Sequence, residues 1–228
     1  RLRPVLQAEE CATGPIATLR LLFLTAQALR SIGKTGVPEV SVGPRMTHGQ
    51  NQIHESPFGS PSSFVAVDVL PVRRLYDPTI FRGYRATVRC ANTGSVETFM
   101  KLWQEECQQR PVSEGVAVVL GAGNVTGLAA ADAVSQIFEH GRAVLLKLHP
   151  VQSSLAPVFR AALKPLVEAG LLSVVVGGAA LVTDAISAQE VTAMHLTGGE
   201  ETFRNVVSSN KKKLLTKSIT CELGNVIP

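Results

Sequence analysis

The second half of the chain alternates short apolar runs with longer amphipathic stretches, and this pattern limits the folds open to it. Two parallel strands can be joined only through a crossover, which is usually a helix, so this alternation favours an α/β fold. We expect an open, mainly parallel sheet with helices on both faces. The expected strands are residues 116–120, 143–148, 171–176, 191–196 and 218–223, and the expected helices are residues 128–140, 154–169, 183–189 and 200–208.

The first part of the chain, residues 1–113, is less regular and is expected to form a separate N-terminal segment before a domain at 114–228. Residues 16–32 have apolar positions three and four apart and predict a helix that Gly33 ends. Residues 33–63 are rich in Gly, Pro, Ser and His and predict a long loop. Strands are expected at 64–72 and 82–90, and a helix at 96–108.

Composition excludes several classes of protein. Hydrophobic residues make up 45% and charged residues 18%, which is typical of a globular domain. The net charge of +4 comes from scattered basic residues, so no nucleic-acid partner is expected. We interpret the dense run Lys211-Lys212-Lys213 as a solvated loop. The apolar stretch at 19–29 contains Arg20 and Gln27 and is too short and polar to predict a transmembrane span.

The cysteines and histidines show no metal-ligand spacing. Cys11, Cys90, Cys107 and Cys221 lie far apart, and the chain contains no C-x-x-C pair. No metal site is therefore expected. Cysteines without a disulfide pattern favour a reducing, cytoplasmic setting.

In an open parallel sheet, ligands bind beyond the carboxyl ends of the strands. The five expected strand ends carry glycines or functional side chains, namely Asn124, Lys147, Gly177-Gly178, Thr197-Gly198-Gly199 and Glu222. Residues 121–127, G-A-G-N-V-T-G, are one residue longer than the usual dinucleotide fingerprint. They suit either a phosphate loop or a plain turn into a helix.

Three of the other strand ends also have two interpretations. Lys147 could bind a ribose hydroxyl or 2′-phosphate, or extend to solvent. Thr197-Gly198-Gly199 could present amides to a phosphate or form an ordinary turn. Glu222 could be a general base or a surface glutamate. Cys221 is its neighbour on a strand and would face the opposite side, so we assign it a structural role.

The order and spacing of these motifs are more specific than any one of them. The series G-N-V-T-G, L-L-K-L-H-P, E-A-G-L-L-S-V-V-V-G-G, H-L-T-G-G and C-E-L-G-N resembles the aldehyde dehydrogenase superfamily over residues 114–228. The wording L-K-L-H-P-V and E-L-G-N-V is most similar to the acyl-CoA reductase branch, the relatives of the luminescence fatty-acid reductase. Earlier residues match only loosely, through 75–84. The resemblance implies a Rossmann-like cofactor domain.

The resemblance also implies roles. Asn124 matches the asparagine whose amide helps to form an oxyanion hole, and Glu222 matches the glutamate that acts as general base or gates deacylation. Lys147 matches the lysine that binds the adenosine ribose. Gly198 and Gly199 match the turn near the pyrophosphate, with a glycine in place of the usual serine, and Gly178 lies where a glycine packs by the adenine. The implied cofactor is NAD or NADP, and the implied substrate is an aldehyde or an acyl-thioester.

One departure concerns the nucleophile. In the family the attacking cysteine follows the E-L-G motif, in a catalytic domain that is absent here, so Cys221 cannot take that role. We therefore expect a cofactor-binding fragment, inactive alone, of an enzyme that is a homo-oligomer at full length. Two alternatives stay open: a naturally short, non-catalytic nucleotide-binding or regulatory protein of the same superfamily, and a conventional dinucleotide-fold NADP dehydrogenase.

Overall fold

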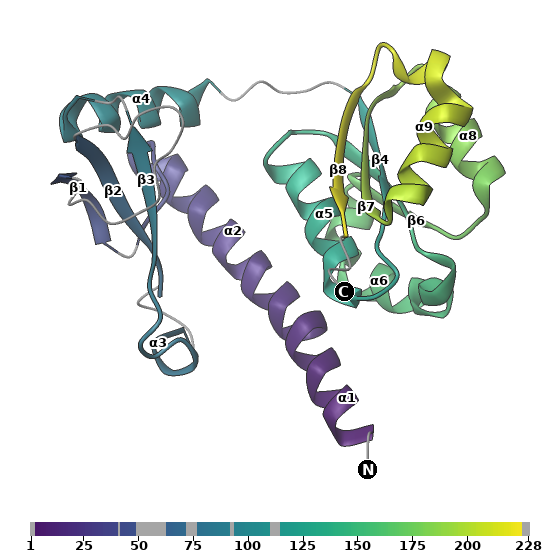
Figure 1. The fold of residues 1–228 in the computed structure, drawn as a ribbon, viewed down its shortest axis with the longest axis horizontal. Coiled ribbons are helices and arrows are strands. Elements are labelled where there is room, and N and C mark those ends of the chain that lie inside the picture. Colours follow the sequence, from purple (N-terminus) through teal and green to yellow (C-terminus); the bar gives the residue numbers. More distant parts are fainter. Residues whose placement is uncertain are drawn as a thin grey trace. The chain divides into compact units, whose positions relative to one another are not determined.

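The computed structural model describes residues 3–40, 42–48, 63–71, 77–91, 94–109 and 115–224 (Figure 1). The chain divides into two compact units, one made of Arg1–Thr25 with Pro111–Pro228 and the other of Ala26–Arg110. The first division falls within the long helix α2, Ala17–Thr35. The domain boundary expected at residues 113 and 114 lies outside the described residues.

The first unit contains a five-stranded sheet in the order β6-β5-β4-β7-β8, and every neighbouring pair is parallel. The sheet confirms the predicted open parallel architecture. Each expected strand is present, with bounds that differ by two residues at most. The strands are β4 (Val116–Leu120), β5 (Ala143–Lys147), β6 (Leu172–Val175), β7 (Val191–Gly198) and β8 (Ser218–Leu223).

Helices cover both faces of this sheet, as expected (Figure 1). Alternate residues of β4 point to opposite faces, so Val119 packs with α5 and α6, whereas Val118 packs with α8 and α9. β4 is buried on both sides, which explains its uninterrupted apolar sequence. The helical elements are α5 (Thr126–Phe138), the 3-10 helix η2 (Pro150–Leu155), α6 (Ala156–Ala162), α7 (Lys164–Glu168), α8 (Ala179–Ser187) and α9 (Glu200–Leu214).

Three of the helices that cover the sheet differ from the prediction by more than two residues. The helix expected at 154–169 is divided into η2, α6 and α7. α6 and α7 are separate because Pro165, in the first turn of α7, cannot donate the hydrogen bond that would continue α6. α8 begins at Ala179, four residues before the expected start. α9 continues to Leu214, so the lysine run at 211–213 lies in its last turn rather than in a loop. Cations are favourable there because they face the carbonyl end of the helix.

The helix expected to begin at residue 16 extends back to Arg3, through the π-helix η1 (Ala12–Ile16) and α1 (Arg3–Cys11). No residue of α1 is buried, so its sequence lacks the apolar stripe that would have predicted it. η1 packs against the first turn of α5. A Cβ added to Gly127 would meet the carbonyl oxygen of Thr13 there.

The second unit contains the antiparallel sheet β1-β2-β3, formed by Val42–His48, Ser63–Leu70 and Ala86–Ala91. α3 (Asp77–Ile80) precedes β3, and α4 (Val96–Gln108) packs Phe99 against Val65 and Val67 of β2. β1 corrects the loop expected at 33–63. A register shift between Val42 and Arg45 breaks the alternation that would have predicted a strand. Residues 49–62 of that stretch, and residue 72 of the strand expected at 64–72, lie outside the described residues.

The strand expected at 82–90 begins only at Ala86, because α3 and a turn occupy the residues before it. No helix in the described part of the chain combines the length and apolar character needed to cross a bilayer.

Candidate functional site

A cleft of about 1110 Å³ lies at the carboxyl ends of the parallel strands. From β4 the chain builds β5 and β6 on one side and then β7 and β8 on the other. The connections after β4 and β7 therefore leave in opposite directions and open a crevice between them. The lining includes residues 120–124 at the end of β4, 197–199 at the end of β7 and 222–224 at the end of β8, together with side chains of α8 and α9.

The cleft brings together most of the residues singled out from the sequence. Five of the six line it, namely Asn124, Lys147, Gly198, Gly199 and Glu222. The sixth, Gly178, is the N-cap of α8 and directly precedes Ala179, which lines the cleft. The strand ends thus meet at one cleft, whereas the contacts within it depend on tertiary packing.

The first two glycines of G-A-G-N-V-T-G allow close packing. A Cβ added to Gly121 would lie 2.8 Å from the Cβ of Ala129 on α5. A Cβ added to Gly123 would lie 2.5 Å from Nδ1 of His149. Both glycines are therefore needed by the protein itself, whether or not a phosphate binds nearby. Asn124 follows them and is an exposed polar side chain on the wall of the cleft.

Lys147 ends β5 on the same wall. Its carbonyl oxygen accepts a hydrogen bond of 3.1 Å from the amide of Gly121, which ties the strand end to the loop after β4. Partial burial lowers the pKa of the Lys147 ammonium. A partly desolvated ammonium gains from any hydroxyl or anion that enters the cleft to accept its hydrogen bonds.

The turn after β7 leaves backbone open to the cleft. Gly199 is the N-cap of α9, and a Cβ added to it would meet nothing within 4 Å. The carbonyl oxygen of Gly198 accepts a hydrogen bond of 2.9 Å from the amide of Gly224, which joins this turn to the end of β8. The space beside Gly199 is therefore available to a ligand, in contrast to the space beside Gly123.

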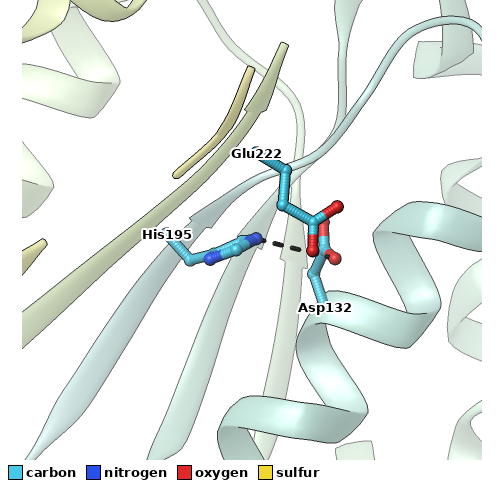
Figure 2. A group of neighbouring side chains, drawn as sticks. All are labelled: Asp132, His195 and Glu222. Carbon is cyan, nitrogen blue, oxygen red and sulfur yellow. Dashed lines mark ion pairs between the residues drawn. The ribbon is translucent and has the colours of Figure 1, made fainter. Parts of the chain in front are cut away.

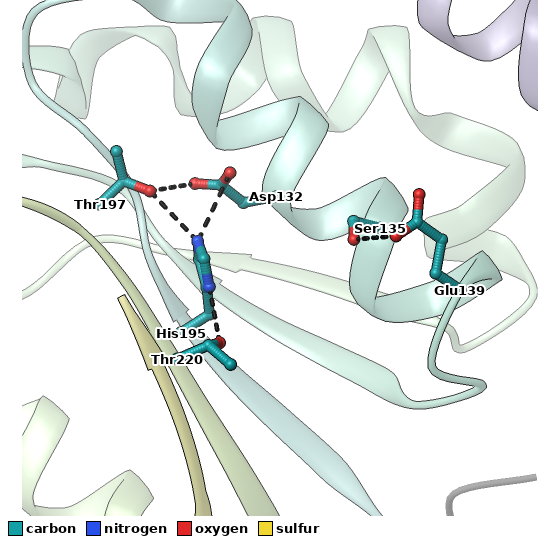
Figure 3. A network of polar contacts seen from close by, with 6 residues as sticks. All are labelled: Asp132, Ser135, Glu139, His195, Thr197 and Thr220. Carbon is teal, nitrogen blue, oxygen red and sulfur yellow. Dashed lines mark hydrogen bonds and ion pairs between the residues drawn. The ribbon is translucent and has the colours of Figure 1, made fainter. Parts of the chain in front are cut away.

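A network of polar side chains lies beside this turn, between α5, β7 and β8 (Figure 3). Thr197 Oγ1 donates to Oδ2 of the buried Asp132 at 2.8 Å. His195 Nε2 lies 3.2 Å from Thr197 Oγ1 and 3.6 Å from Asp132 Oδ1. On the other side of the ring, His195 Nδ1 lies 2.8 Å from Thr220 Oγ1.

Glu222 completes a group of three ionisable side chains. A ligand atom from each of Asp132, His195 and Glu222 lies within 4.8 Å of the others (Figure 2). The Asp132 carboxylate, 3.6 Å from Nε2, is the main cause of a raised pKa of His195. The charge of Glu222 adds to this, while burial opposes it. The arrangement favours an imidazolium between two carboxylates.

Asp132 and His195 have no role predicted from the sequence. Asp132 lies on an alanine-rich helix, and its approach to β7 depends on tertiary packing. A weak signal does exist. His195 with Thr197, and Thr220 with Glu222, are polar pairs spaced by two on neighbouring strands, and such a spacing places each pair on one face.

None of the four cysteines is among the described residues that line the cleft. All four are free thiols, and Cys11 and Cys221 are exposed. Cys221 adjoins Glu222 on β8, so the two side chains point to opposite faces of the sheet.

Solved structures of two dehydrogenases and of a proline utilization protein align with about half of this chain. Succinic semialdehyde dehydrogenase from Streptococcus pyogenes, in complex with NADP⁺, is 22% identical with a TM-score of 0.42, and the match covers 49% of this chain and 24% of that one. Delta-pyrroline-5-carboxylate dehydrogenase from Mycobacterium tuberculosis, bound with NAD, is 19% identical with a TM-score of 0.41, covering 57% and 28%. Proline utilization A from Bradyrhizobium japonicum is 19% identical with a TM-score of 0.42, covering 50% and 12%.

The chain thus spans about a quarter of the length of the first two proteins and 12% of the third. No curated protein matches it. The family profile described as "Aldehyde dehydrogenase family" matches residues 76–226, which is well over half of the chain. The chain belongs to the aldehyde dehydrogenase family.

Proposed function

We propose that the cleft binds NAD or NADP, and that residues 114–228 are the cofactor-binding half of an NAD(P)-dependent aldehyde dehydrogenase or acyl-CoA reductase. The observation that carries the proposal is the convergence of five strand-end residues on one cleft at the switch point of a parallel sheet. Its volume of about 1110 Å³ is ample for a dinucleotide.

Each part of the cofactor has a group suited to it. Lys147 would donate hydrogen bonds to the adenosine ribose, for which its partly desolvated ammonium is suited. Gly198 and Gly199 would lie near the pyrophosphate, where the open space beside Gly199 lets a ligand approach the backbone. Gly178 would pack by the adenine at the start of α8.

When bound, the nicotinamide would supply or accept a hydride. Attack of a cysteine thiolate on the carbonyl carbon forms a C–S bond and moves negative charge onto the carbonyl oxygen. The amide N–H of Asn124 would donate to that oxygen. Glu222 would accept the proton of the attacking thiol or of the water that releases the acyl group. No described cysteine lines the cleft, so the proposal assigns the thiol to none of the four.

The sequence motifs and the cysteines also favour a particular substrate and compartment. The runs L-K-L-H-P-V and E-L-G-N-V favour an acyl-thioester over a free aldehyde as substrate. Four free thiols suit a reducing, cytoplasmic compartment. We propose a homo-oligomer for the full-length enzyme, since the catalytic domain of this family supplies oligomer contacts.

Titration of the 228-residue chain with NADH and NADPH, followed by nicotinamide fluorescence, tests the cofactor proposal. We expect saturable binding, and we expect Lys147→Ala to weaken it roughly tenfold or more, because hydrogen bonds to a charged donor are worth about 1.5–3 kcal/mol. Lys164→Ala is the matched control, because this exposed lysine on α7 pairs with Glu168 and does not line the cleft. Equal loss in both variants, or no saturable binding by the unaltered chain, contradicts the proposal.

A further inference from the structure

The proposed function leaves Asp132 and His195 without a role, although the Thr197 hydroxyl contacts both side chains beside the cleft. Asp132 is 8% exposed, and the side chain of His195 is 12% exposed. Burying a carboxylate is costly unless it is paired. Two carboxylates, Asp132 and Glu222, also repel each other unless a cation lies near both. The cluster therefore needs a positive charge, and the His195 imidazole supplies one when it is protonated.

The hydrogen bonds decide which nitrogen gains and loses a proton. An ionised Asp132 can only accept, so the Thr197 hydroxyl uses its proton on Asp132 Oδ2. Thr197 Oγ1 is then left as the acceptor for an N–H at His195 Nε2. The variable proton is therefore the one on Nδ1, which faces Thr220 Oγ1 at 2.8 Å. This hydroxyl can donate to a neutral Nδ1 or accept from a protonated one, so both charge states of the ring keep the same contacts.

The two edges of the ring face different surroundings. Asp132 of α5, Thr197 of β7 and Glu222 of β8 act on the ring from the cleft side, and Thr197 and Glu222 line the cleft. Thr220 of β8 is exposed and is not among the lining residues. The charges that act on the imidazole are the two carboxylates. Protons can therefore reach Nδ1 without passing through the cleft. The positive charge that a proton brings to the ring interacts with the Glu222 carboxylate.

We propose that His195, held by Asp132, is a positioning residue for Glu222. The imidazolium fixes the Glu222 carboxylate at the cleft and exchanges its Nδ1 proton with solvent on the Thr220 side. The inference rests on the role proposed for Glu222, and it adds a proton-dependent control of that residue. A divalent cation could supply the same charge. However, Thr197 already occupies hydrogen-bonding positions on both Asp132 and His195, which favours a proton.

Imidazole nitrogen NMR on histidine-labelled protein tests the inference without any enzymatic activity. His195→Gln assigns the His195 signal. Asp132→Asn and Glu222→Gln should each move the His195 titration to lower pH. The larger change is expected in Asp132→Asn, because the interaction of His195 with the Asp132 carboxylate is the main cause of the raised pKa. Glu200→Gln is the matched control. This glutamate on α9 pairs with the exposed Arg204 and should leave the His195 titration unchanged.

A second NMR measurement follows the Glu222 side chain. In glutamate-labelled protein, the side-chain carboxyl signal of Glu222, assigned with Glu222→Gln, should shift as His195 titrates. That shift should vanish in His195→Gln, whereas a merely structural histidine would leave it in place. If Asp132→Asn does not fold, the Glu222→Gln and His195→Gln comparisons still decide the matter.

Two results would overturn the inference. One is a His195 titration that is the same in the unaltered chain and in Glu222→Gln. The other is a His195 signal that changes when a chelator is added, which would place a metal in the cluster instead of a proton. Failure of the unaltered chain to bind NADH or NADPH would count against the proposed function but leave the coupling of the two side chains measurable. If the chain binds the cofactor but the titrations show no coupling between His195 and Glu222, this inference is wrong and the proposed function stands.

Discussion

At the scale of single residues, the glycines of the cleft have different tasks. Gly123 is pressed against the ring of His149, so its lack of a side chain serves packing within the protein. Gly199 has open space around it and a backbone conformation that any residue can adopt, with φ of −80°. Only the second glycine leaves room that a ligand could use, although both belong to glycine-containing turns in the sequence.

Gly199→Ala tests this difference. The added methyl group meets nothing within 4 Å, so we expect the melting temperature to stay unchanged. If the pyrophosphate lies against this backbone, the methyl group will occupy its place, and NAD(P)H binding should fall roughly tenfold, which is about 1.4 kcal/mol. Gly43→Ala on β1 is the control, because a Cβ there also meets nothing and the residue does not line the cleft. Unchanged affinity in Gly199→Ala would move the pyrophosphate elsewhere.

Several residues selected from the sequence line the cleft because they lie at the ends of strands. Asn124, Lys147 and Glu222 could be selected because each follows or ends an apolar run, and the carboxyl ends of parallel strands meet at one edge. His195 was missed because its partners come from α5 and from the neighbouring β8. Those neighbours depend on strand order and helix packing, which a linear pattern does not contain.

At the scale of elements, burial separates the helices and strands that could be predicted from those that could not. The strands of the parallel sheet were predictable because they are short apolar runs bounded by polar or glycine residues. α1 was not, since none of its residues is buried, and β1 was not, since its bulge disturbs the alternation. The division between α6 and α7 could have been predicted from Pro165.

α8 gives a prediction at this scale, because it covers one face of the sheet through Ile186, which is 0% exposed. Ile186→Ala should reduce the free energy of unfolding by about 2–5 kcal/mol, from lost burial and the cavity left behind. Val158→Ala on α6, at a position 60% exposed, should change it by less than about 0.5 kcal/mol. Urea denaturation followed by far-UV circular dichroism measures both. The single tryptophan, Trp103, belongs to the other compact unit and would not report on α8. Similar losses in both variants would show that α8 is not anchored through Ile186.

At the scale of the whole molecule, the cleft and the polar network are products of one topology. The reversal of strand order after β6 places β7 beside β4 and β8 beside β7. That order opens the crevice at the strand ends, and it also sets Thr220 and Glu222 next to His195 and Thr197. A change of pH that alters the charge of the network should therefore change the stability of the folded chain.

The pH dependence of stability tests this link. Because the pKa of His195 is raised in the folded protein above its ordinary value of 6.5, protonated His195 stabilises the fold fully below about pH 6.5. That stabilisation should be lost as the pH rises through the folded pKa. Melting temperatures measured between about pH 5 and about pH 9 should fall across this window in the unaltered chain. This fall in melting temperature should be absent in His195→Gln. Asp132→Asn should flatten the same part of the curve, since it removes the main cause of the raised pKa. A curve for His195→Gln that runs parallel to that of the unaltered chain would mean that His195 carries the same charge in the folded and unfolded protein.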